Sequence, residues 1–265
     1  MKRSAAGTFP TYKQAAKRVT RKTKTRAGFS STARTRGAAV QGEMKYMDSD
    51  YNAVAIPAVT TTWVAGTMAD PLATINLGTA AVANPQCLCA PQVGATLNSR
   101  VGRKINVHKI KVHGKLTAAF QTLQPAPDSG CKIRVVLVQD MQTNAGQMTG
   151  AQLYNDGTGP NTVINTFQNP NNFGRFRVLK DKMYQISDLN ITTDAAGAAI
   201  AQAAKVINFK FMVNFKKPVV VHFNATNAGT VGDIVDNSFH ILAATDNVSF
   251  APTLSYYCRV AYKDV

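Results

Sequence analysis

The first 42 residues contain no aspartate or glutamate, and this feature limits where the chain can fold. They hold 11 of the 30 lysine and arginine residues, and neither leucine nor isoleucine occurs before Ile56. A segment with so few large apolar side chains cannot offset the entropy cost of ordering its backbone. We therefore predict a disordered basic arm over residues 1–42 and a single folded domain over residues 43–265.

The charge of the arm predicts a nucleic-acid partner. Its basic side chains are Lys2, Arg3, Lys13, Lys17, Arg18, Arg21, Lys22, Lys24, Arg26, Arg34 and Arg36. Such a segment binds phosphates by releasing counterions and does not read the base sequence. The spacing of Tyr12, Ala15, Ala16 and Val19 is compatible with a short basic helix, but we favour a coil, and either form binds phosphates. The cluster over residues 17–26 would also serve as a nuclear localisation signal.

The rest of the chain has an all-β pattern. Strands rich in Val, Ile, Phe and Tyr are predicted over residues 105–118, 131–139, 174–187, 206–216, 218–224, 238–245 and 253–263, with a weaker candidate over residues 59–65. Long connections over residues 66–99, 140–172 and 188–205 separate them, and the alanine-rich stretch 195–204 could form a brief helix. Seven or eight strands with long loops favour a jelly roll, which is a sandwich of two antiparallel sheets.

Two strands carry more specific information. In the first long strand the apolar phase runs through Ile105 and Val107 and then shifts by one residue to Ile110 and Val112. This shift predicts a β-bulge or bend near His108. Residues 133–138 are apolar on both faces, so we expect a central or interface-facing strand and not an exposed edge.

The sequence lacks the usual signatures of an enzyme. It contains no phosphate-binding GxxxxGK[ST] loop, no GxGxxG after a strand, no HExxH and no GxSxG motif, so we expect no catalytic activity and no cofactor. His108, His113, His222 and His240 are expected to be ordinary core or surface residues.

We also expect no metal site and no disulfide. Cys87 and Cys89 form a CxC fragment without a second pair, which does not build a tetrahedral zinc site. The four cysteines are expected to be reduced thiols, since neither a signal peptide nor a membrane-spanning run is present, and we expect a soluble intracellular protein without membrane insertion. Asp48 with Asp50, or Asp233 with Asp236, could help to bind a hard cation, but solvated carboxylates are the simpler interpretation.

Several segments resemble the capsid proteins of small circular single-stranded DNA viruses that encode a replication initiator protein. These are NSRVGRK at residues 98–104, VLVQDMQTN at 136–144, NPNNF at 169–173, RVLKDK at 177–182 and SYYCRVAY at 255–262. No single segment is diagnostic, and the resemblance depends on their order and spacing together with the basic arm.

The resemblance implies a structural protein of the virion that self-assembles into a small icosahedral shell. About 60 copies of a single eight-stranded jelly roll would close the smallest (T=1) shell. The arm would lie inside on single-stranded DNA, and assembly in the host nucleus would involve a nuclear import receptor. Arg100, Arg103 and Lys104, together with Lys109, Lys111 and Lys115, are candidates for a basic inner face, and a solvated strand edge is the alternative.

Two other functions remain open from sequence. One is a non-capsid nucleic-acid-binding protein, such as a viral nuclear shuttle or movement protein or a ribosome-associated β-domain. It would be distinguished by a β-surface on which aromatic and basic side chains alternate. The other is the coat protein of a small RNA or satellite virus, since an arm that binds phosphates binds both DNA and RNA.

Overall fold

A computed structural model of the chain describes residues 43–59, 84–118, 131–154, 163–186, 205–247 and 251–265, together with the backbone of residues 73–75 and 82–83. All of them belong to one compact unit, Glu43–Val265. The arm, residues 60–65 of the weak strand candidate and the alanine-rich stretch 195–204 lie outside the described residues.

The described residues form a β-rich unit with only short helical turns. Its strands are β1 (Lys45–Ala55), β2 (Ala73–Ile75), β3 (Val82–Ala83), β4 (Lys104–Thr117), β5 (Cys131–Asp140), β6 (Phe176–Ile186), β7 (Val206–Phe223), β8 (Ile234–Asp236), β9 (Ser238–Thr245) and β10 (Thr253–Asp264). The short helical turns are α3 (Gly150–Leu153), η2 (Val163–Asn165), η3 (Pro170–Asn172) and η4 (Val231–Asp233). The all-β prediction is confirmed.

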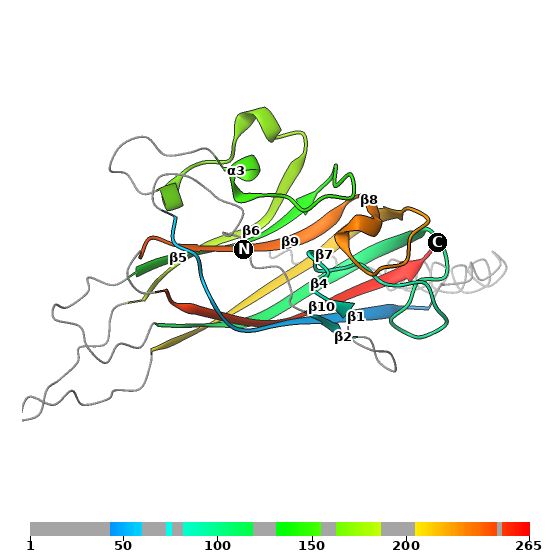
Figure 1. Ribbon diagram of the computed structural model, residues 1–265, viewed down its shortest axis with the longest axis horizontal. Helices are drawn as coiled ribbons and strands as arrows, with labels where there is room; N and C mark the ends of the chain where they lie inside the picture. The colour runs from blue at the N-terminus through cyan, green and yellow to red at the C-terminus, as the bar shows by residue number, and fades with distance from the viewer. Residues whose placement is uncertain are drawn as a thin grey trace, which may run out of the picture. The chain divides into compact units, whose positions relative to one another are not determined.

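The strands make two antiparallel sheets that pack face to face (Figure 1). One has seven strands in the order β3-β2-β1-β10-β4-β7-β8, and the other has three in the order β6-β5-β9. Strand β1 was not predicted as a strand, and the two predicted strands over residues 206–216 and 218–224 are a single strand, β7.

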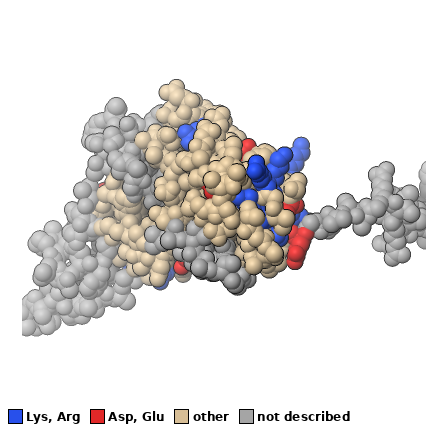
Figure 2. Space-filling view, turned by 45° about the vertical axis from the view of Figure 1, so that its right-hand side comes forward, with Lys and Arg blue, Asp and Glu red and all other residues tan. Residues whose placement is uncertain are grey.

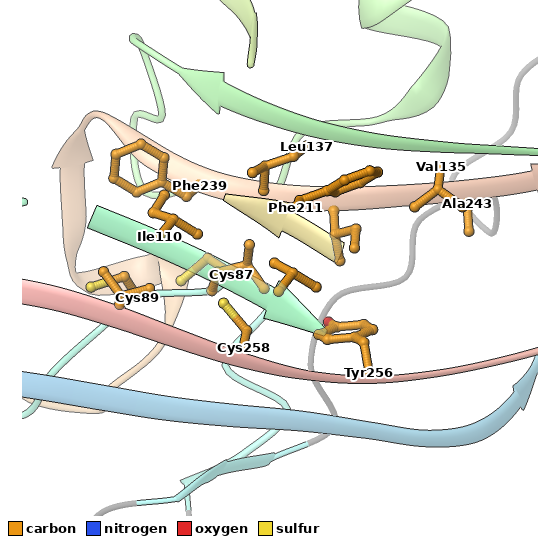
Figure 3. Close-up of a cluster of buried hydrophobic side chains, with 14 of the residues drawn as sticks. Cys87, Cys89, Ile110, Val135, Leu137, Phe211, Phe239, Ala243, Tyr256 and Cys258 are labelled. Carbon is orange, nitrogen blue, oxygen red and sulfur yellow. The ribbon is translucent and has the colours of Figure 1, made fainter. Parts of the chain in front are cut away.

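The core lies between the two sheets and follows from the alternation along the strands. Figure 3 shows Phe239 and Leu137 of the three-stranded sheet facing Ile110 and Phe211 of the seven-stranded sheet. These side chains are at most 1% exposed. A residue facing the core is followed by one facing away from it, so the alternation also fixes which side chains reach the outer face of each sheet.

The outer face of the three-stranded sheet is covered by its own loops. Val136 and Val138 of β5 pack with Leu242 of β9 against Leu153 and Tyr154 from the segment between β5 and β6. Strand β5 is therefore buried on both faces and central in its sheet, as predicted. Among the described residues, no second apolar cluster lies on the outer face of the seven-stranded sheet.

The predicted bulge in β4 is confirmed at His108. In the pairing with β10, Ala261 lies opposite Lys109 and Tyr262 lies opposite Val107, so His108 has no partner. The pairing with β7 skips His108 as well. Ile105 and Val107 face the core before the bulge, and Ile110 and Val112 face it afterwards.

The CxC fragment lies in the core and not at a metal site. Cys87 and Cys89 are buried close to Cys258 of β10 (Figure 3), and all four cysteines are free thiols. Burial raises the pKa of Cys258 to about 12 and also raises the pKa of Cys89. In the described part of the chain, no group of three or more His, Cys, Asp or Glu residues could hold a metal ion.

Candidate nucleic-acid interface

The outer face of the seven-stranded sheet is a regular grid of side chains. Strands β1, β10, β4 and β7 are neighbours, and their registers align outward-facing residues in rows that cross the sheet. From β1 to β7 the rows are Tyr46–Ala261–Lys109–Asn214, Asp48–Arg259–Lys111–Met212 and Asp50–Tyr257–His113–Lys210.

This face is basic. The lysine and arginine side chains that the alternation places on it are Lys104, Lys109, Lys111, Lys115, Lys210, Lys216, Arg259 and Lys263. The acidic residues placed on it by β1 are Asp48 and Asp50. In the view of Figure 2, lysine and arginine side chains gather at the right-hand end of the described residues, beside a few aspartate and glutamate side chains. A face with this excess of positive charge favours phosphate ligands.

One arginine on the face is already neutralised. Nε and Nη2 of Arg259 donate to the two carboxylate oxygens of Asp48 at 2.7 and 2.6 Å, and the Tyr257 hydroxyl donates to the same carboxylate at 2.7 Å. These hydrogen bonds raise the pKa of Arg259, while partial burial and then the Asp48 contact raise the pKa of Tyr257. The pair fixes the guanidinium in place above the sheet.

The lysines of β4 are not neutralised in this way. Lys109, Lys111 and Lys115 form no ion pair or side-chain hydrogen bond with another described residue. Their positive charge is therefore available to a ligand. We predicted all three for a basic face, and the structure does bring them to one face of one sheet.

Two hollows lie on this face. One of about 360 Å³ is lined by Met44, Tyr46, His108, Lys109, Lys111, Asn214, Arg259 and Ala261. A second, more open one of about 410 Å³ lies farther along the same strands, with His113, Lys115, Tyr257 and Asp50 among its lining residues. Both combine basic side chains with tyrosine, which is the combination that binds phosphates and stacks bases.

Arg103 and Lys104 lie at the start of β4 and are exposed. The antiparallel pairing places Ile105 opposite Asp264 of β10, and Tyr262 opposite Lys45 of β1. The start of β4 is therefore at the end of the sheet where the chain enters β1. Both residues remain candidates for phosphate contact.

The geometry of Arg100 argues against our prediction that it binds nucleic acid. Its side chain is 1% exposed, and it donates to the backbone carbonyls of Pro91, Gly102 and Thr226 at 3.0, 2.7 and 3.1 Å. The guanidinium also lies 4.4 Å from the ring centroid of Phe223, and burial lowers its pKa. Arg100 holds loops together and presents no charge to a phosphate.

The eleven basic residues of the arm, from Lys2 to Arg36, lie outside the described residues, so their role stays a prediction. The sequence analysis missed Arg259, Lys263 and Lys210 as members of the basic face. Alternation along their own strands places them outward, but only the order of the strands shows that they join the β4 lysines.

One buried polar pair in the described residues has the spacing of a nucleophile and its base. Ser238 Oγ lies 2.7 Å from His240 Nε2, as a nucleophile and base would, but both residues are 0% exposed and no substrate reaches them. His222 pairs with Asp236 at 2.8 Å, and the two side chains are 38% and 31% exposed. Asp233 accepts hydrogen bonds from the Gly229 amide and the Thr226 hydroxyl, so it closes a loop.

None of the helices in the described part of the chain has the length and apolar character needed to cross a bilayer. A scan against protein-family models finds no match, and a search of curated proteins finds no significant relative.

Proposed function

We propose that this chain is a structural capsid protein that self-assembles into a small icosahedral shell and packages single-stranded DNA through its basic N-terminal arm. The observation that supports this most is the order of the strands in a sandwich with one basic outer face. The function is that of a virion component, with assembly in the host nucleus and no enzymatic step.

The strand order is the one expected for a jelly roll with a single strand unaccounted for. Among the long strands, β1, β4, β7 and β10 lie in one sheet and β5, β6 and β9 in the other. The chain changes sheet from β4 to β5, from β6 to β7, from β7 to β9 and from β9 to β10, and it stays in one sheet from β1 to β4 and at the β5–β6 hairpin. Such alternation produces the two Greek keys of a jelly roll.

The chain crosses to the other sheet directly after β1. There Ala58 forms a parallel bridge with Thr245, the last residue of β9, and the Val59 amide donates to the Thr245 carbonyl at 2.8 Å. A jelly roll of eight strands needs one more strand between β1 and β4. The sequence candidate for it, residues 59–65, lies outside the described residues beyond Val59.

The two outer faces of the sandwich differ as a shell subunit requires. The three-stranded sheet is covered by the segment between β5 and β6, while the outer face of the seven-stranded sheet carries Lys109, Lys111 and Lys210. We propose that the basic face turns toward the lumen. With about 60 copies, the arms alone would bring roughly 660 positive charges to the genome.

The same face also supports a second candidate function. Tyr46 and Tyr257 are 39% and 43% exposed on the same face as Lys109, Lys111 and Arg259. This is the surface expected of a nucleic-acid-binding protein that does not form shells, such as a nuclear shuttle protein. The coat protein of an RNA or satellite virus is the other alternative, since phosphate contacts serve DNA and RNA alike.

Electron microscopy of the purified full-length chain tests the proposal. We expect uniform closed particles after mixing with single-stranded DNA across a series of salt concentrations and pH values. A variant that lacks residues 1–36 is the control for packaging: it should lose salt-sensitive DNA binding while it keeps a folded β-domain. Only monomers or dimers under every condition, together with retained DNA binding, would favour the shuttle-type function.

A further inference from the structure

We propose that the hollow formed by Tyr46, Ala261, Lys109 and Lys111 is a binding site for one nucleotide of a single-stranded nucleic acid, with its phosphate on the two lysines and its base against Tyr46. The inference deepens the proposed function, because it assigns part of the packaged strand to a built site on the folded domain in addition to the arm.

The floor of the hollow is a small residue between two large ones. Tyr46, Ala261 and Lys109 form one row across β1, β10 and β4, and Ala261 is 8% exposed. Neighbouring strands lie about 4.8 Å apart, so Tyr46 and Lys109 begin about 10 Å from each other with only a methyl group between them. This gap creates the volume of about 360 Å³.

The bulge in β4 supplies the phosphate-binding end. If β4 alternated without interruption after Ile105 and Val107, residue 109 would face the core. Because His108 is the extra residue, Lys109 faces outward together with Lys111, and both line the hollow. β-Bulges redirect side chains in this way and are frequent beside functional sites.

The charges in the hollow favour a phosphate. Arg259 lines it but is paired with Asp48, so the net positive charge comes from Lys109 and Lys111, which have no partner among the described residues. His108 lines the same hollow, and its pKa is lowered by burial and by Lys263, which keeps its ring largely uncharged at neutral pH. Two lysine ammonium groups therefore meet the phosphate.

Tyr46 gives the site its preference for a single strand. It is 39% exposed, and the Arg259 guanidinium lies 6.0 Å from its ring centroid. A base stacks on an aromatic side chain only when it is not already stacked in a duplex, and such contacts are sequence-tolerant. We therefore expect binding of single-stranded DNA without a preference for base sequence.

Photo-crosslinking with the full-length chain tests the position of the base. A single-stranded oligonucleotide of about 12 thymidines that contains 5-iodouracil is irradiated with the protein, and crosslinked peptides are identified by mass spectrometry. We expect a crosslink at Tyr46 that a duplex of the same sequence does not give. Crosslinks confined to residues 1–42, or equal crosslinking of the duplex, would overturn the proposal.

Binding measurements on variants separate a built site from general charge. Tyr46→Leu should weaken oligonucleotide binding about tenfold, since one base stack is lost. Ala261→Leu fills the hollow without a change of charge and should weaken binding to a similar extent with an unchanged salt dependence. Lys109→Gln with Lys111→Gln should lower the slope of log K against log salt by about 0.7, the value for the loss of one phosphate contact.

The matched control is Lys180→Gln with Lys182→Gln, which removes two exposed lysines from β6 on the other sheet. We expect this variant to keep the wild-type affinity at the hollow and the crosslink to Tyr46. If Ala261→Leu binds like the wild type while its circular dichroism is unchanged, the hollow is not the site. The two proposals can fail separately. If particles form normally but the Tyr46, Ala261 and Lys109/Lys111 variants all bind DNA like the wild type, this inference alone is refuted. If Tyr46 is crosslinked but no particles form, the capsid function alone is refuted.

Discussion

Arg134 and Asp181 form a bidentate ion pair, with Nε and Nη2 of the arginine 3.0 and 2.6 Å from the two carboxylate oxygens. The pair joins central strand β5 to edge strand β6. Nη1 of Arg134 also donates to the carbonyls of Ile164 and Thr166, both at 2.8 Å, and the guanidinium stacks on Tyr154 at 4.0 Å from the ring centroid. The Arg134 side chain therefore holds the segment between β5 and β6 against the outer face of the three-stranded sheet.

We expect Arg134→Met to lower the free energy of unfolding by about 2 kcal/mol, because it leaves the Asp181 carboxylate and two loop carbonyls without their donor. Asp181 is one-third exposed, so water compensates part of the loss. Urea denaturation measures the change. Arg177→Met on the exposed side of β6 is the control, and equal stability of the two variants would contradict a fastening role for Arg134.

Gly114 in β4 is required because its neighbour fills the space of a side chain. A Cβ atom there would lie 2.4 Å from Cε1 and Cζ of Phe209, which is buried in the core, and 3.0 Å from the Ser255 carbonyl. We expect Gly114→Ala to destabilise the fold by about 2 kcal/mol through overpacking. Thermal unfolding measures this, and Gly114→Ala combined with Phe209→Leu should recover part of the loss.

Gly174→Ala is the control for that measurement, since nothing lies within 4 Å of its Cβ position. We expect its effect to stay below about 0.5 kcal/mol. A Gly114→Ala variant as stable as Gly174→Ala would show that the Phe209 ring moves aside without cost.

Local patterns in the sequence were sufficient for the bulge but not for the length of β7. The phase shift around His108 is visible in one strand, because each side chain must face either the core or solvent. The sequence analysis predicted two strands, 206–216 and 218–224, with a break between them. In the structure β7 is continuous, because residues 215–218 lie where its pairing with β4 is already interrupted, between Val107 and Lys109 of β4. Pro218 has no amide hydrogen to donate, and at this interruption that lack costs little stability.

The candidate site required knowledge of which strands are neighbours. Lys111 could be placed outward from its own strand, but its row with Arg259 and Met212 depends on the order β10-β4-β7. Arg100 was placed wrongly for the same reason. Its neighbours in sequence suggested an exposed basic cluster, but contacts with Thr226 and Phe223, which are distant in sequence, bury its side chain.

The cysteines provide a test of the core. We expect the four free thiols to resist a thiol reagent such as Ellman's reagent at pH 8 in the folded protein and to react rapidly in denaturant without a reductant. The reason is burial, which hinders access and raises the pKa of Cys258 to about 12, so little thiolate forms. Fewer reactive thiols in the denatured, unreduced chain would instead reveal a disulfide.

The same thiol makes stability depend on pH in the alkaline range. Folding raises the pKa of Cys258 above its ordinary value of about 8.5, so the unfolded chain loses its proton first as the pH rises. The stabilisation is complete below pH 8 and decreases as the pH rises from there toward 12. Urea midpoints from pH 7 to 10 should fall less steeply for Cys258→Ala than for the wild type.

An exposed aromatic pair marks where a second copy would contact the subunit if the capsid proposal is correct. Phe167 and Phe173 are 87% and 57% exposed on the segment that covers the three-stranded sheet. Exposed aromatic side chains of this size are typical of protein–protein contacts. Phe167→Ser should therefore reduce the yield of particles in sedimentation velocity experiments several-fold while the melting temperature of the unassembled subunit stays unchanged. Phe167→Leu, which keeps an apolar contact, should assemble much better than Phe167→Ser, and equal yields from both variants and the wild type would exclude this surface from the interface.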